Sequence, residues 1–436
     1  MRTLIAIAAA LIACAHDASS PGPATIASPA SPTSSFAGAP EVVSFVPGVA
    51  AALSPAPLSP APLAPAAPPA PAASALELVE TAPVETSLRH AELREAWQVW
   101  PEMISRATAR IDLGEFYATE QSPSRLTPII AALEAAVARG VRVRFIADAG
   151  FAKHETRVLE ELTARGVDVR RFDVKASMGG VQHAKYFIVD GREAYLGSQN
   201  FDWRSLEHIQ ELGLRFRQPD AVRALEDIFE TDWAAAEGKP APKPSSAYEF
   251  PQHTRDGADV TLLASPRGFL PDEKLWDLPA LVELVDSAKQ SVRAQALTYS
   301  EVPELQAALT RATARGVTVQ LITSDWELRP KTLRDLRALD GRIAVRILTI
   351  PQAHAGFIPF SRVAHAKYCV VDGARGWVGT SNWEPDYFFK SRNVGLLIDG
   401  GQIPAQLETF FSGNWASPYA APFDRAREYT APRISQ

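Results

Sequence analysis

Two short segments of the chain each place a histidine and a lysine two residues apart. They are His183 with Lys185 in HAKYFIVDG, and His365 with Lys367 in HAKYCVVDG. In strand conformation the two side chains of each pair leave the same face. Burying a lysine without a partner is costly, so one such pair alone would indicate a solvated strand face. Because the pair occurs twice, at equivalent points of a repeat, we expect both pairs to converge on one cleft.

Two imidazoles and two ammonium groups that face one cleft suit a phosphodiester. The ammonium groups would stabilise the negative charge that develops on the non-bridging oxygens. One imidazole would attack phosphorus, and the other would protonate the leaving oxygen and later activate water. A metal site is the alternative, but lysine is not a ligand, its charge repels divalent cations, and the His–Lys face carries no carboxylate. We therefore expect neither a metal nor a cofactor.

Four further polar residues follow the two His–Lys pairs at matching positions. Asn200 in GSQN and Asn382 in GTSN come after the second strand of each predicted hairpin, where an amide can donate to phosphate oxygens. Glu211 occupies the place that Asn393 holds in the second copy. A carboxylate there can fix the tautomer of an imidazole, so the two histidines should have unequal pKa values. The fuller first copy favours its own histidine as nucleophile, although Glu211 could instead reach across to the histidine of the second copy.

Two aspartates of the same segments are expected to be structural. Asp190 and Asp372 each precede a glycine at the turn of a predicted hairpin. At about 3.3 Å per residue, seven strand residues would separate Asp190 from His183 by roughly 20 Å. Both aspartates should therefore stabilise the turns and take no part in the chemistry.

The segments that carry these residues belong to a duplicated unit. Three segments of the first copy recur in the second with an offset of 176 residues for the first pair and 182 for the others: 126–148 and 302–325, 183–200 and 365–382, 225–233 and 407–415. Each copy alternates strand and helix patterns, which indicates an α/β fold with mixed, largely parallel sheets flanked by helices. We predict two tandem α/β domains related by pseudo-two-fold symmetry, at 86–240 and 258–425, joined by a linker over 239–258.

The first 85 residues have a different composition. Arg2 precedes an apolar run, Leu4 to Ala13, which is too short to span a membrane and typical of an export signal. Leu11 to Cys14 resembles a bacterial lipoprotein cleavage box, which predicts a signal over residues 1–14 and lipidation of Cys14. Residues 15–85 are rich in Pro, Ala and Ser, which predicts a disordered tether. We expect an exported protein, lipid-anchored at a bacterial envelope membrane, namely the outer membrane.

Charge and cysteine content restrict the function classes further. The chain of 436 residues has 44 Lys and Arg against 50 Asp and Glu, a net charge of −6. This excludes a nucleic-acid binder that relies on a broad basic surface, but it allows a small cationic pocket. Two cysteines, Cys14 and Cys369, cannot form a disulfide framework. No protein partner can be inferred.

The motif H-x-K-x4-D followed by G-[ST]-x-N, present twice, resembles the signature of the phospholipase D superfamily. The segments GSQNFDWRSLEHIQELG, IPFSRVAHAKY, GTSNWEPDYF and NWASPY are most similar to the lysosomal phospholipase-D-like 5′-exonucleases and their viral relatives. The resemblance spans about residues 88–420 and implies phosphohistidine chemistry without a metal and cleavage of single-stranded nucleic acid from its 5′ end. Related members act on phospholipids by hydrolysis or head-group exchange, as in cardiolipin synthases. A catalytically inactive surface-binding module is a third reading. By position, the resemblance assigns the site to His183, Lys185, Asn200, His365, Lys367 and Asn382, with Glu211 orienting an imidazole.

Aromatic residues flank the motifs. Bases stack on such side chains in proteins that bind single strands, although core packing would also explain them. Tyr117 and Tyr299 are expected at corresponding strand ends, lining the cleft together with Trp383.

Overall fold

The computed structural model describes residues 76–152, 156–244 and 246–435. The predicted export signal, Cys14 and residues 15–75 of the predicted tether lie outside the described residues.

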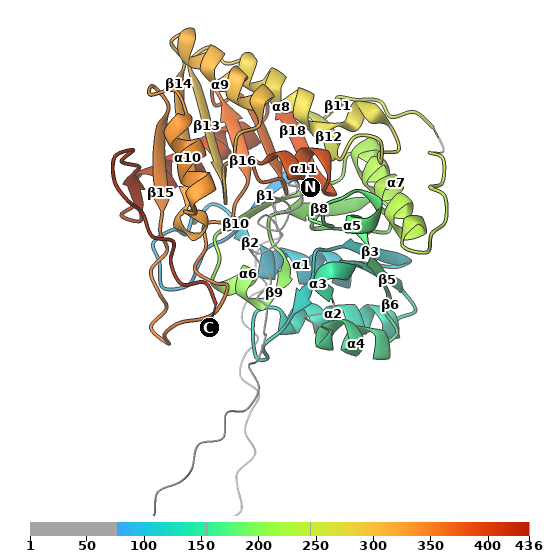
Figure 1. Ribbon diagram of the computed structural model, residues 1–436. Coiled ribbons are helices and arrows are strands. Elements are labelled where there is room, and N and C mark those ends of the chain that lie inside the picture. Colours follow the sequence, from blue (N-terminus) through green and yellow to red (C-terminus); the bar gives the residue numbers. More distant parts are fainter. Residues whose placement is uncertain (1–75, 153–155, 245, 436) are drawn as a thin grey trace, which may run out of the picture. The chain divides into compact units, whose positions relative to one another are not determined.

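The first copy of the repeat forms a sheet with helices on both faces (Figure 1). In chain order its elements are β1 (Leu76–Thr81), β2 (Arg94–Glu95), α1 (Ala96–Ser105), β3 (Arg110–Gly114), β4 (Ala118–Thr119), α2 (Thr127–Ala138), β5 (Arg142–Asp148), α3 (Ala149–Ala152), α4 (Arg157–Ala164), β6 (Asp168–Phe172), α5 (Val174–Ser177), β7 (Tyr186–Val189), β8 (Glu193–Gly197), β9 (Phe201–Asp202), α6 (Trp203–Glu207), β10 (Glu211–Phe216) and α7 (Pro219–Ala235).

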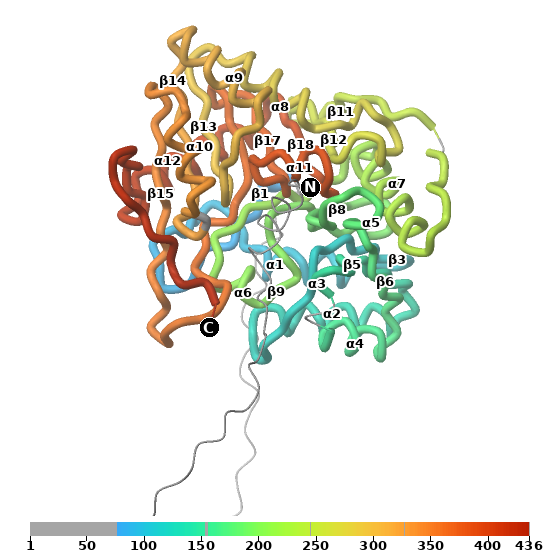
Figure 2. Tube along the Cα trace, viewed as in Figure 1, coloured from blue at the N-terminus to red at the C-terminus, as the bar shows by residue number. Residues whose placement is uncertain are grey.

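The second copy repeats most of this order, and its chain runs from yellow to red along the tube in Figure 2. Its elements are β11 (Gln252–His253), β12 (Asp259–Ser265), the 3-10 turn Glu273–Leu275, α8 (Asp277–Asp286), β13 (Ser291–Ala296), α9 (Pro303–Ala314), β14 (Thr318–Ser324), the 3-10 turn Asp325–Glu327, α10 (Pro330–Ala338), β15 (Ala344–Leu348), β16 (Tyr368–Val371), β17 (Arg375–Gly379), α11 (Pro385–Phe389), β18 (Asn393–Asp399), α12 (Ile403–Ala416) and β19 (Ala420–Pro422).

Each copy contributes one mixed sheet. The strand orders are β2-β1-β10-β8-β7-β3-β5-β6 and β11-β12-β18-β17-β16-β13-β14-β15-β19. Both sheets are mixed, as predicted, but they are not largely parallel. Parallel pairing joins β3, β5 and β6, and likewise β13, β14 and β15, with a short β1–β2 pair besides. The central hairpins β7–β8 and β16–β17 are antiparallel because a short turn can only reverse the chain.

The predicted start of the first domain is placed too late. The composition predicts a tether that includes residues 76–85, yet Leu76–Thr81 form β1, which pairs antiparallel with β10. This strand is the counterpart of β12, which pairs with β18 in the second copy. Its sequence, LELVET, is short and follows a long Pro/Ala tract, so the change of composition at Leu76 is easily missed.

Apolar side chains form a central core between the sheets and an outer core in each copy. The central core includes side chains from α7 and α12, and α7 packs on β12 of the other copy (Figure 1). The outer cores lie under α1, α2 and α4 in the first copy and under α8, α9 and α10 in the second. Tyr186 and Ile188 of β7 join the central core, whereas Phe187 and Val189 join the outer one. The hairpin strands are therefore buried on both faces, which explains their continuous apolar sequences.

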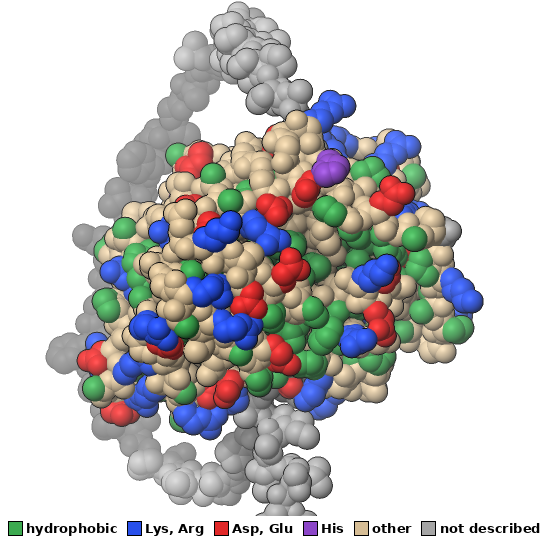
Figure 3. All heavy atoms as spheres, turned by 90° about the horizontal axis from the view of Figure 1, so that it is seen from above, with side chains coloured by type: hydrophobic (Ala, Val, Ile, Leu, Met, Phe, Trp, Pro, Cys, Tyr) green, Lys and Arg blue, Asp and Glu red, His purple; other side chains and the backbone are tan. Residues whose placement is uncertain are grey.

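Surface charges are mixed over the face shown in Figure 3, where acidic and basic side chains alternate. Within the described part of the chain, no helix combines the length and apolar character that crossing a bilayer requires.

Candidate active site

The two His–Lys pairs lie immediately before a strand in each sheet, not within one as expected. The ladder of β7 begins at Tyr186, just after Lys185, and that of β16 begins after Lys367. The amide of His183 donates to the carbonyl of Arg392 at 3.0 Å, and the amide of His365 donates to the carbonyl of Gln210 at 2.9 Å. Each histidine thus leaves its own sheet and bonds to the chain that enters β18 or β10 of the other copy.

This crossing brings the four groups into one site. The pKa of His183 lies well below its ordinary value because the ring is buried, and because the charges of Lys185, Lys367 and His365 act on it. Burial and the same two lysines lower the pKa of His365. A histidine from each copy therefore senses both ammonium groups.

Both lysines are buried and held by the main chain. Lys185 is 1% exposed and Lys367 is 0% exposed. The Nζ of each donates to the carbonyl oxygen of the histidine two residues earlier. Lys185 Nζ also lies 4.9 Å from the centroid of the Phe116 ring. Each ammonium group is therefore fixed at the main chain of the histidine of its own pair, where it can stabilise an anion.

Asn393 of the second copy orients His183 of the first. Asn393 Oδ1 lies 3.1 Å from His183 Nδ1. The Nδ2 of Asn393 donates to the carbonyls of Tyr387 and Ser391, and Thr380 Oγ1 donates to Oδ1. Since Oδ1 can only accept, Nδ1 of His183 carries the hydrogen. The lone pair of the imidazole is then on Nε2.

Glu211 of the first copy orients His365 of the second. Glu211 Oε2 lies 2.7 Å from His365 Nδ1, and Ser205 Oγ donates to Oε1 at 2.9 Å. Burial raises the pKa of the Glu211 carboxyl to about 8, against the opposing effect of Lys367. The sequence left open whether this carboxylate serves its own copy or the other; the structure places it on the other.

The groups that orient the two imidazoles therefore differ in proton content. The Glu211 carboxyl beside His365 keeps its own proton until the pH exceeds about 8. The amide of Asn393 cannot store a proton, so His183 stays neutral under the same conditions. The site thus combines a neutral imidazole with a lone pair and an imidazole that can be supplied with a proton.

Asn200 and Asn382 lie three residues beyond the ends of β8 and β17. Both side chains are buried, and among the described residues neither Oδ1 has a hydrogen-bond partner. The backbone amide of Asn200 bonds to Ser205 Oγ, the hydroxyl that also holds Glu211. This links the position of Asn200 to that of the carboxylate.

Asp190 and Asp372 brace the hairpins, as their positions before glycine suggested. Asp190 accepts from the backbone amides of Thr108, Ala109 and Arg110 and from the Thr108 hydroxyl. Asp372 accepts from three amides, those of residues 289–291. Each aspartate therefore joins its turn to the chain that enters β3 or β13. Partial burial raises the pKa of Asp190, but the hydrogen bonds outweigh it and the pKa is lowered.

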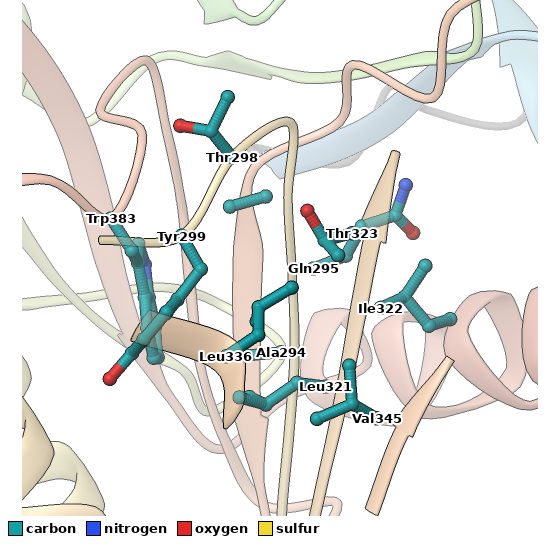
Figure 4. A pocket seen from close by; sticks show the side chains of 11 residues that line it. Ala294, Gln295, Thr298, Tyr299, Leu321, Ile322, Thr323, Leu336, Val345 and Trp383 are labelled. Carbon is teal, nitrogen blue, oxygen red and sulfur yellow. The ribbon is translucent and has the colours of Figure 1, made fainter. Parts of the chain in front are cut away.

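The three aromatic residues that the sequence predicts to line the cleft, Tyr117, Tyr299 and Trp383, lie in different surroundings. The Tyr117 hydroxyl donates to Asp202 Oδ2 at 2.9 Å, and its ring packs 5.4 Å from that of Phe116. Tyr299 and Trp383 are only 4% and 2% exposed and belong to the outer core of the second copy. They line a cavity of about 10 Å³, next to Thr298 and Leu336 (Figure 4).

The expected equivalence of Tyr117 and Tyr299 is wrong by one residue. The bridge of Tyr299 to Trp383 matches that of Ala118 to Phe201, so Tyr299 corresponds to Ala118. The counterpart of Tyr117 is Thr298, whose hydroxyl donates to Glu384 as Tyr117 donates to Asp202. A shift of one residue sends a strand side chain to the other face, so the two tyrosines have different surroundings.

Three further residues lie next to the site: Tyr387 and Phe116, which are among the aromatic residues that flank the motifs, and Glu115, which the sequence did not predict. The rings of Tyr387 and Phe116 lie 4.7 and 5.3 Å from that of His183. Glu115 is buried and acts electrostatically on Lys185, and burial raises its pKa well above the ordinary value. Nothing in the spacing of Glu115 relates it to the repeated motif. Within the described ranges, no group of three or more His, Cys, Asp or Glu side chains is arranged to hold a metal ion.

Comparison with known proteins gives matches over both copies. The family model described as "Cardiolipin synthase, PLD-like domain" matches residues 101–233 and 281–415. Phospholipase D Z of Dictyostelium discoideum is 30% identical over 388 residues, 80% of this chain and 90% of that protein. The 5'-3' exonuclease PLD4 of Mus musculus is 32% identical over 308 residues, 61% of each chain. The virion nicking-joining enzyme of vaccinia virus (strain Western Reserve) is 28% identical and covers 79% of this chain and 88% of that protein.

The fold of the protein is also similar to that of a solved structure. Phosphatidylserine synthase of Haemophilus influenzae Rd KW20 superposes with a TM-score of 0.56 and 13% identity, over 75% of this chain and 85% of that one. This is a likeness of fold alone. The family model, by contrast, matches well over half of the sequence, in two segments that each contain one His–Lys pair. The chain therefore belongs to the phospholipase D superfamily and is a phosphodiesterase of that superfamily.

Proposed function

We propose that the protein hydrolyses phosphodiesters through a covalent phosphohistidine formed on His183. The observation that supports this most directly is the exchange of orienting groups between the copies. His183 is held by Asn393 and His365 by Glu211, with Lys185 and Lys367 acting on both rings.

In the first step, Nε2 of His183 attacks phosphorus and forms a P–N bond. The bond from phosphorus to the leaving oxygen breaks, and that oxygen takes a proton from Nε2 of His365. Glu211 keeps this imidazole supplied with a proton up to about pH 8. Lys185 and Lys367 offset the charge that builds on the non-bridging oxygens, and Asn200 and Asn382 are the candidates to donate hydrogen bonds to them.

In the second step, water replaces the histidine. His365, now without its extra proton, accepts one from water as the water oxygen bonds to phosphorus. The P–N bond breaks, and His183 returns to the neutral state with its lone pair on Nε2. A phosphate monoester leaves, and both imidazoles are restored.

Single-stranded nucleic acid, cleaved from its 5′ end, is the substrate that we favour. Similarity to the mouse protein named a 5'-3' exonuclease supports this choice. So does the aromatic cluster beside the nucleophile, in which the Phe116 ring lies 4.1 Å from that of Phe151 and 5.3 Å from that of His183. Nucleobases stack on such rings without regard to sequence.

A phospholipid is the alternative substrate, with hydrolysis or head-group transfer as the reaction. The cardiolipin synthase description of the family model and the name of the Dictyostelium relative support this alternative. In a transfer reaction, an alcohol would replace water in the second step.

One experiment separates the readings. Purified protein is incubated in EDTA with a 5′-hydroxyl oligonucleotide and, separately, with phosphatidylglycerol vesicles. We expect mononucleotides from the first and no change in the second. Phosphatidic acid or cardiolipin from the second would favour the alternative. A folded sample that cleaves neither substrate, nor bis(p-nitrophenyl) phosphate, would contradict the proposed function and support an inactive binding module.

We also propose export and lipidation at Cys14, on the basis of the sequence of residues 1–14. Labelled palmitate should be incorporated into the wild-type protein and not into a Cys14→Ser variant. Equal labelling of the two proteins, or none, would contradict this.

A further inference from the structure

A buried ion pair joins the two copies behind His183. Asp232 of α7 and Arg392, just before β18, are both 0% exposed. Arg392 Nε donates to both carboxylate oxygens of Asp232, at 3.1 and 2.8 Å, and Nη2 donates to Oδ1 at 2.7 Å. Nη1 and Nη2 also donate to the carbonyls of Ser265 and Phe269, at 2.9 and 2.8 Å. The guanidinium is thus fixed by partners from two separate segments, α7 and the end of β12 with the turn that follows it.

The main chain of Arg392 holds the segment that carries His183. Its amide donates to the carbonyl of Val181 and its carbonyl accepts from the amide of His183, both at 3.0 Å. The next residue is Asn393, whose side chain orients the imidazole. Any displacement of Arg392 therefore reaches the histidine by two routes, through the backbone and through Asn393.

The other histidine has the same backbone arrangement but a neutral anchor. Gln210 corresponds to Arg392, and its carbonyl accepts from the amide of His365. Its Oε1 accepts from Gln295 Nε2 at 2.6 Å, and Gln295 Oε1 accepts from Asn414 Nδ2 at 3.4 Å. Asn414 of α12 is the counterpart of Asp232. One histidine is thus anchored by an ion pair and the other by amides.

We propose that the Asp232–Arg392 pair is a positioning device that acts selectively on His183 from outside the reacting centre. The pair keeps Nε2 of His183 aligned with the phosphorus atom, and it leaves His365 to the amide anchor. Arginine suits this task because its planar group serves a carboxylate and two carbonyls at once, which the point charge of lysine cannot do. The catalytic consequence rests on the proposed function, whereas the effect on the His183 ring does not.

The test uses a double variant for which the chain provides the template. Asp232→Asn with Arg392→Gln installs at this place the residue types of the other copy, Asn414 and Gln210, and leaves no buried charge unpaired. Gln295→Leu is the matched control, since it removes the amide that anchors the segment of His365. Both are made in the full chain and compared with wild type by circular dichroism, thermal melting, kcat and KM on bis(p-nitrophenyl) phosphate, and imidazole NMR of histidine-labelled protein.

We expect the double variant to fold, to lose at least tenfold in kcat with KM changed less than twofold, and to shift the signals of His183 but not those of His365. The control should shift the signals of His365 and leave those of His183 in place. A folded double variant with wild-type kcat, or with both rings shifted equally, would overturn the proposal.

Arg392→Lys is a second variant that tests the proposal if the double variant does not fold. It keeps the charge and should give a smaller loss of kcat and a smaller shift of His183. Unfolding of both variants would assign the pair a structural role only and overturn the proposal. If wild type cleaves no phosphodiester, the proposed function fails, while the NMR comparison still decides whether the pair positions His183.

Discussion

The Oε2 atom of Glu211, in the first copy, lies 2.7 Å from Nδ1 of His365, in the second. The opposite relationship, between His183 and the second copy, is made by the amide of Asn393. A duplicated fold with near-symmetric motifs therefore holds two histidines in unlike surroundings, and the difference depends on the presence of one carboxylate.

The first prediction concerns that carboxylate. Glu211→Gln removes the group that stores a proton beside His365, so protonation of the leaving oxygen should be impaired. We expect kcat for an alkyl phosphodiester to fall by about 10²-fold, the scale of general acid catalysis. Steady-state assays from pH 5 to 9 check this.

The same carboxylate also predicts the direction in which activity changes with pH. The proposed mechanism needs the protonated form of the Glu211–His365 pair, so wild-type activity should decline as pH rises through about 8. In Glu211→Gln this decline, the basic limb of the pH–activity profile, should occur at a lower pH. Glu304→Gln, on the exposed face of α9, is the control and should keep the wild-type profile. An unchanged basic limb in Glu211→Gln would contradict the assignment.

Asn393→Asp should move the acid limb instead. A carboxylate beside His183 favours the protonated form of the ring and raises its pKa, whereas the proposed mechanism needs the neutral form. As the pH is lowered, activity should therefore be lost about one pH unit or more earlier, at a higher pH, than in wild type. Gln402→Glu adds the same charge at an exposed position and should leave the limb in place. A shift toward lower pH would have the wrong sign.

Removal of His365 should trap the intermediate. With bis(p-nitrophenyl) phosphate the leaving group needs no proton, so His365→Ala can still form the P–N bond but hydrolyses it slowly. Mass spectrometry of peptides kept at alkaline pH should find the phosphoryl group on His183. His183→Ala should accumulate none. Phosphorylation found on residue 365 in a His183→Ala protein would reverse the assignment of nucleophile and acid.

Asp190→Ala should affect stability and not chemistry. The change leaves three backbone amides and a hydroxyl without their acceptor, which should lower the free energy of unfolding by about 1–3 kcal/mol. Urea denaturation measures this, and kcat of the folded fraction should equal that of wild type. Asp372→Ala should behave alike, since its carboxylate makes the same backbone contacts. A loss of kcat with unchanged stability would contradict the bracing role.

The sequence predicted the duplicated α/β fold and the residues that meet at the site because both copies carry the same motif. Repetition supplied what spacing within one copy could not, a reason for His183 and His365 to converge. It also drew attention to Glu211, because the motif differs from its copy at that point.

Other features could not be predicted because they depend on contacts between distant segments. The pairing of Asp232 with Arg392 joins residues 160 positions apart and follows no motif. The sequence predicted largely parallel sheets, whereas many strand pairs are antiparallel. Which strands pair depends on the strand order in the sheet, and the alternation of strands and helices along the chain does not specify that order. The predicted position of Tyr299 was wrong because the two copies were aligned with a shift of one residue. Such a shift moves a strand side chain to the opposite face of the sheet.

The exchange of orienting groups has a consequence for the integrity of the chain. Neither copy alone contains a histidine together with the residue that fixes its tautomer, so a fragment ending after α7 would carry His183 without the amide that orients it. A protein cut between α7 and β11 would regain turnover only when its pieces reassociate. By the same reasoning, an ancestor with a single copy of this unit would have worked only as a pair of identical subunits.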